Sequence, residues 1–159
     1  MAYEEWIQAA EFEPLESVHL AFAIRPALWL GDPARARAVA DRLDADPDAG
    51  RQGPGANRTV AWAGIAALEG RRDEALAGFR DACRRYRELG ADFPFAWIVL
   101  DALILLGPEE PAIRDQADEA RAIFERVRAV PYLEWLDAAL RQPAHPPLAT
   151  TRVVVARGT

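Results

Sequence analysis

The side chains best suited to nucleophilic or metal chemistry in this sequence are one cysteine and two histidines. Cys83 stands on an arginine-flanked stretch without a neighbouring ligand, whereas His19 falls in an apolar segment and His145 lies near prolines. A zinc site needs clustered Cys, His or carboxylate ligands, and this spacing does not supply them. We therefore predict no metal, no cofactor and no catalytic residue, and we expect Cys83 to pack in the core.

A glycine-rich segment, residues 52–59, precedes an expected helix, as a phosphate-binding loop does. Its sequence, QGPGANRT, lacks the Gly-Lys-Ser/Thr ending of such loops, and no strand precedes it. Nucleotide binding is not expected here. The chain is accordingly predicted not to be an enzyme.

The charge distribution argues against nucleic acid as a partner. The formal net charge is −6, and all 19 basic residues are arginines interleaved with Asp and Glu. A nucleic-acid binder needs a basic face that displaces counterions from phosphates. The single cysteine, the acidic N-terminal segment and the lack of a long apolar run predict a cytoplasmic chain without a membrane partner.

The elements that must position any site recur along the chain. Three segments, residues 31–43, 70–82 and 118–127, each begin a helix after a turn, and they align on Ala36, Ala75 and Ala120. Their apolar residues are spaced by three and four, which places them on one helix face. The predicted buried residues on these faces are Ala40, Leu43, Phe79, Ala82, Phe124 and Val127, and Tyr86 and Leu89 extend the face of the second segment.

A more apolar helix is expected before each of these segments, at residues 14–30, 56–69 and 93–106. Pro26 is expected to bend or break the first of them. Residues 44–55 form a Pro- and Gly-rich link, and Pro111 is placed in the first turn of a helix after a break at Gly107. A short helix over 131–140 would cap the last pair. These elements predict an all-α domain over 1–141, with three helix pairs and a cap, and an extended or disordered tail over 142–159.

The run from Gly70 to Ala82, GRRDEALAGFRDA, resembles the second half of a tetratricopeptide repeat, and residues 118–127 repeat it. The segment 31–43 departs from the pattern because Ala40 stands where an aromatic residue is expected. The resemblance implies a right-handed solenoid of antiparallel helix pairs that binds proteins or peptides through a concave groove.

A second, more specific resemblance covers residues 100–140. This segment is similar to the closing part of large bacterial signalling proteins that join a class III adenylate/guanylate cyclase domain, or a LuxR-type regulator, to an ATPase and then to tetratricopeptide repeats. It implies a non-catalytic C-terminal part of a longer protein. The partner would then be a protein or peptide, a domain of the same parent chain, or a second copy.

The groove positions that the repeat resemblance implies come from the three inner helices. They are Arg25, Trp29, Asn57, Gly64, Trp97 and Asp101. Arg25 and Asp101 could equally be solvated or paired with each other. Among the five tryptophans, core packing is the general expectation, and Trp29 and Trp97 are also candidates for interface anchors.

Two alternative functions remain open from the sequence. The stack could mediate self-association, which exposed apolar residues on the first and last helices would favour. It could also be a small-molecule sensor of the LuxR-type regulator class, with a ligand held between helix pairs.

Overall fold

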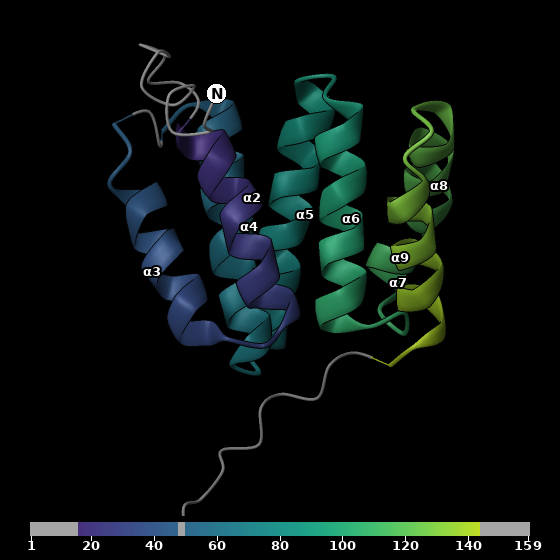
Figure 1. The fold of residues 1–159 in the computed structure, drawn as a ribbon, viewed down its shortest axis with the longest axis horizontal. Helices are drawn as coiled ribbons and strands as arrows, with labels where there is room; N and C mark the ends of the chain where they lie inside the picture. The colour runs from purple at the N-terminus through teal and green to yellow at the C-terminus, as the bar shows by residue number, and fades with distance from the viewer. Residues whose placement is uncertain (1–15, 48–49, 144–159) are drawn as a thin grey trace, which may run out of the picture.

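Every regular element is a helix in the part of the chain that the computed structural model describes, residues 16–47 and 50–143 (Figure 1). The all-helical class predicted from the sequence is confirmed for these residues. The helices are α2 (Glu16–Trp29), α3 (Pro33–Asp44), α4 (Gln52–Leu68), α5 (Arg72–Glu88), α6 (Asp92–Leu106), α7 (Pro111–Arg114), α8 (Ala117–Arg126) and α9 (Val130–Arg141). Within the described ranges no helix is long and apolar enough to cross a membrane.

One turn geometry closes four of these helices. After α2, α4 and α5, a glycine with positive φ is followed by a residue whose N–H donates to the carbonyl five positions back: Asp32 to Ala27, Arg71 to Ala66, and Ala91 to Tyr86. The same bond follows α8, from Ala129 to Phe124. This is the Schellman arrangement, which satisfies the carbonyls at a helix end and favours glycine at the left-handed position.

Helices that follow one another in the chain pack together, and α6 lies at the centre of the arrangement. α2 contacts α3, α4 contacts α5, and α6 contacts α8, while α6 also contacts α2, α4, α5 and α9. Figure 1 shows the helices side by side, from α3 at one end to α8 and α9 at the other. This central place explains why nearly every residue of α6 from Phe95 to Leu106 is buried.

The buried faces predicted from helical spacing are largely confirmed. Ala36, Ala75, Ala120, Phe79 and Phe124 are all fully buried. Leu89 and Val127, which were predicted to continue two of these faces, are exposed by 44% and 49%. That prediction was wrong because α5 ends at Glu88 and α8 ends at Arg126, so both residues lie beyond the helical face.

Two element boundaries differ from the sequence prediction. α4 begins at Gln52, inside the expected link, because Pro54 falls in the first helical turn, where no intrahelical N–H donor is needed. α2 runs unbroken through Pro26. Pro111 begins α7, a separate single turn, and two turn residues separate it from α8. The short helix predicted over 131–140 is confirmed as α9, and most of the predicted tail, from residue 144 on, lies outside the described residues.

Candidate functional site

An aromatic cluster joins the first, central and last helices. α2 contributes Phe22 and Trp29, spaced by seven, and α9 contributes Tyr132 and Trp135, spaced by three, so each pair shares a helix face. Adjacent rings have centroids 4.7 to 5.8 Å apart, mostly in edge-to-face geometry, which is favourable for aromatic pairs. The cluster consists of Phe22, Trp29, Phe93, Trp97, Phe124, Tyr132 and Trp135.

A buried polar group lies among these rings. Asp101 is fully buried in α6 and accepts two hydrogen bonds from α2, one from Arg25 Nε and one from Trp29 Nε1, each 2.9 Å long. Arg25 is itself only 6% exposed, and its Nη1 also donates to the carbonyl of Ala21. The pairing of Arg25 with Asp101, which the sequence left as one alternative, is therefore what the structure contains.

Burial and the neighbouring charge act in opposite directions on the Asp101 carboxyl. Desolvation raises its pKa, and the charge of Arg25 and the hydrogen bond from Trp29 oppose that shift. The Arg25 guanidinium also lies 3.8 Å from the centre of the Trp97 ring, a cation–π contact. The Trp97 Nε1 donor is buried and has no hydrogen-bond partner among the described residues.

Two members of the aromatic cluster reach the surface at its edges. Phe22 is 51% exposed and Trp135 is 43% exposed, while Trp29, Phe93 and Tyr132 are half-buried. Large aromatic side chains that are exposed yet held in place by neighbouring rings are typical anchors of protein interfaces, because little conformational freedom is lost when they are covered.

The structure thus brings together four of the six predicted groove residues, Arg25, Trp29, Trp97 and Asp101, and places the other two elsewhere. Asn57 is half-buried and accepts a 2.6 Å hydrogen bond from the Tyr86 hydroxyl, which ties α4 to α5.

Gly64 is buried where α4 approaches α2. A Cβ atom there would lie 2.6 Å from Leu28 Cδ1, so a larger residue at this position would force the Leu28 side chain to shift.

Phe22, Tyr132 and Trp135 are members of the cluster that the sequence reasoning did not select. Tyr132 and Trp135 share one face of α9, a signal that was present in their spacing. Phe22 carried a similar signal, because it lies three residues before Arg25 on α2.

The polar centre of this arrangement is an ion pair whose carboxylate is shielded from solvent and already accepts hydrogen bonds from two donors. Away from it, burial raises the pKa of the Cys83 thiol to about 12, which keeps the thiol protonated and unreactive at neutral pH. In the described ranges, no group of three His, Cys, Asp or Glu side chains is arranged to hold a metal ion.

No family model matches this chain, and neither a curated protein nor a solved structure matches it.

Proposed function

We propose that this chain is a protein-interaction module built as a right-handed, tetratricopeptide-like stack of antiparallel helix pairs. Two observations support the architecture: helices that follow one another in the chain pack together, and one turn geometry recurs at four helix ends. A repeat module of this kind presents a continuous surface formed by successive helices. We assign no reaction to it.

The observation that carries the proposal is the exposure of Phe22 and Trp135 at the edges of one continuous aromatic cluster. Trp135 contacts Trp29 at 5.3 Å and Phe22 contacts Trp97 at 4.7 Å, so both anchors rest on rings that are themselves fixed. The proposed partner is a protein segment that presents apolar side chains to these two anchors.

The buried Arg25–Asp101 pair has a positioning role in this proposal. It joins α2 to α6 beneath the rings and holds Trp29 through its indole N–H. A contact surface made by three helices keeps its shape only if those helices keep their relative positions. The ion pair would supply that constraint at the centre of the cluster.

Peptides selected for binding to the whole chain would test this proposal. The isotope-labelled protein is titrated with a selected peptide, and the indole N–H signals of its tryptophans are followed by NMR. We expect the Trp29 and Trp135 signals to shift first. Backbone amide signals are followed in the same spectra, because α3 and α5 contain no tryptophan. Selected peptides that shift only the amide signals of α3 or α5 would contradict the proposed surface.

Self-association is a second candidate, favoured by a separate observation. Exposed apolar side chains lie on α9 and at the end of α2: Leu30 is 80% exposed and Val130 is 57% exposed. Sedimentation equilibrium of the wild-type chain and of Leu30→Glu and Val130→Glu variants tests it. A concentration-dependent dimer that either substitution dissociates supports self-association, whereas a monomer at all concentrations excludes it.

The signalling context remains a proposal that rests on the resemblance of residues 100–140. It places the module beside a nucleotide cyclase or in a LuxR-type regulator, where its partner would include a domain of its own parent chain. The reading frame that encodes this chain tests the idea. A cyclase or ATPase domain in that frame supports it, and a frame that encodes neither contradicts it.

A further inference from the structure

A hollow of about 420 Å³ lies between α5 and the segment around α7, away from the aromatic cluster. Its volume falls in the range of roughly 300–1,000 Å³ that is usual for small-molecule sites. One wall is a single face of α5, with residues spaced by three and four, and the other wall comes from α7 and the turn after it. The lining residues are Arg80, Cys83, Arg84, Arg87, Glu88, Ala112 and Gln116.

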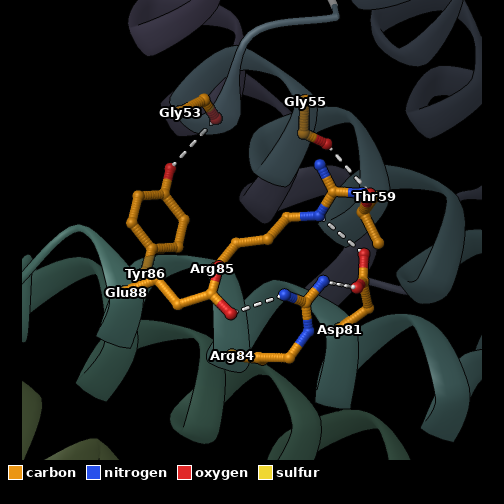
Figure 2. Close-up of polar contacts among 8 residues, drawn as sticks. All are labelled: Gly53, Gly55, Thr59, Asp81, Arg84, Arg85, Tyr86 and Glu88. Carbon is orange, nitrogen blue, oxygen red and sulfur yellow. Dashed lines mark hydrogen bonds and ion pairs between the residues drawn. The ribbon is translucent and has the colours of Figure 1, made fainter.

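Three guanidinium groups line this hollow, although the chain as a whole is acidic. Arg80 has no hydrogen-bond or ion-pair partner among the described residues. Arg84 lies between two carboxylates, Asp81 and Glu88, at 2.6 Å from each (Figure 2). Asp81 is shared with Arg85, at 2.7 Å, so Arg84 and Arg85 divide one carboxylate between them.

Arg87 is held by two contacts. It forms an ion pair with Glu119 of α8, and its guanidinium lies 4.2 Å from the centre of the Phe95 ring. The ion pairs of Arg84 and Arg87 are largely exposed, and exposed pairs contribute little stability. An anion with two charges could therefore replace Glu88 and Glu119 as a partner of these arginines and engage Arg80 as well.

The remaining lining residues favour an organic ligand over a bare ion. Gln116 donates through Nε2 to the carbonyl of Ala112 at 2.7 Å, and its Oε1 acceptor is buried without a partner in the described part of the chain. Because Oε1 has almost no accessible surface, the Gln116 side chain must turn toward the hollow before this acceptor can bond to a ligand's hydroxyl or amino donor. Cys83 and Ala112 add uncharged surface beside it.

We propose that this hollow binds a small organic phosphate, whose dianionic group is held by Arg80, Arg84 and Arg87 while a hydroxyl donor bonds to Gln116. Arginine suits this task because its planar fork of donors matches phosphate oxygens. The site is independent of the proposed protein-binding surface, which lies on α2, α6 and α9.

The test is an NMR titration of the whole chain with glycerol 3-phosphate, inorganic phosphate and glycerol, at constant ionic strength. Glycerol 3-phosphate is expected to give saturable shifts at the four residues named above and to bind more tightly than inorganic phosphate, and glycerol is expected to give none. Arg80→Gln is expected to weaken binding about tenfold through loss of one charge-assisted contact. Gln116→Met should remove the advantage of glycerol 3-phosphate over inorganic phosphate.

Arg35→Gln is the matched control, because Arg35 is an exposed residue of α3 whose side chain also has no partner among the described residues. It removes the same charge at a distance from the hollow and should leave the affinity unchanged. If the shifts do not saturate, or if Arg80→Gln and Arg35→Gln lower the affinity for glycerol 3-phosphate equally, the effect is general charge screening. Either result would overturn the site. Equal affinity for inorganic and organic phosphate would overturn the ligand class. Trp135→Ala should not alter the titration, so failure of this proposal and failure of the protein-binding surface are separable.

Discussion

The Nε atom of Arg25 donates a hydrogen bond to Oδ2 of Asp101 over 2.9 Å, although the two residues lie 76 positions apart in the chain. Both are buried, and Asp101 has no contact with solvent. A buried ion pair is costly to desolvate, so its presence says more about the specificity of helix placement than about net stability. Its consequence is that α2 and α6 are coupled at one point beneath the aromatic cluster.

Asp101→Asn should be strongly destabilising. The amide preserves the shape of the carboxylate but leaves the buried Arg25 cation without a counter-charge, which costs about 3–5 kcal/mol. Urea unfolding followed by circular dichroism measures the loss of stability, provided that the free energy of unfolding keeps the same dependence on urea concentration in both proteins.

The same substitution elsewhere on α6 provides the control for that measurement. Asp92 pairs with Arg126, and both side chains are 60% exposed, so Asp92→Asn should change stability little. The double variant Arg25→Met/Asp101→Leu should recover much of the loss, because it buries no charge. Equal effects of Asp101→Asn and Asp92→Asn would show that the buried pair does not couple the helices.

Phe79→Ala and Phe124→Ala should each lower the free energy of unfolding by about 3–5 kcal/mol. Both rings are fully buried, and truncation leaves a cavity that neighbouring side chains fill only in part. Leu30→Ala, at a side chain that is 80% exposed, should change stability by no more than about 0.5 kcal/mol. Losses of that small size in the phenylalanine variants would contradict the burial of these two rings between helices.

Arg128→Gly should stabilise the protein. Arg128 has a φ of 55° in the turn after α8. In the equivalent turn after α5, this left-handed position is occupied by Gly90, with a φ of 64°. An L-residue in the left-handed region costs about 1 kcal/mol relative to glycine, so removing the side chain should recover up to about that amount. Thermal unfolding measures the gain.

Gly90→Ala is the reciprocal change and should destabilise by about 1 kcal/mol. No atom lies within 4 Å of the added Cβ, so its effect would report backbone conformation alone. If Arg128→Gly and Gly90→Ala both stabilise the protein, or both destabilise it, the two turns do not share the same backbone geometry.

The Cys83 thiol should react slowly with alkylating reagents in the folded protein. Folding raises its pKa from its usual 9.0 to about 12, so the thiolate fraction at pH 8 falls about a thousandfold relative to the unfolded chain. The folded state keeps the thiol proton up to a higher pH than the unfolded state does. The free energy of unfolding should therefore fall as the pH rises from about 9 to about 12.

A Cys83→Ala variant isolates the effect of the thiol on stability. Its free energy of unfolding should fall less between about pH 9 and about pH 12 than that of the wild-type chain. Alkylation rates in buffer and in urea at one pH measure the reactivity directly. Equal rates in the two conditions would mean that Cys83 is accessible in the folded chain.

The sequence was informative wherever one helix face carried the signal. Spacing alone identified the buried side of α5, including Ala75, Phe79 and Ala82. It failed at helix ends, because whether Leu89 is buried depends on where the turn begins and not on its place in the pattern. The early start of α4 was missed for a similar reason: a proline such as Pro54 can lie in the first turn of a helix as well as end one.

The site was predictable only in part. Arg25, Trp29, Trp97 and Asp101 were selected from the inner helices, but their mutual contacts depend on how α2 packs against α6. Spacing along one helix carries no information about that distance. The contribution of Trp135 likewise depends on α9 folding back beside α2 and α6, a tertiary relationship that local periodicity does not encode.

The most direct test of the proposed interaction surface is the affinity of a selected peptide for the wild-type chain and for three variants. We predict that Phe22→Ala and Trp135→Ala each weaken binding at least about tenfold, as expected for interface anchors. Leu89→Ala, at an exposed apolar residue outside the aromatic cluster, should leave the affinity unchanged. Equal affinities for all three variants, measured by calorimetry, would contradict the assignment of this surface as the binding site.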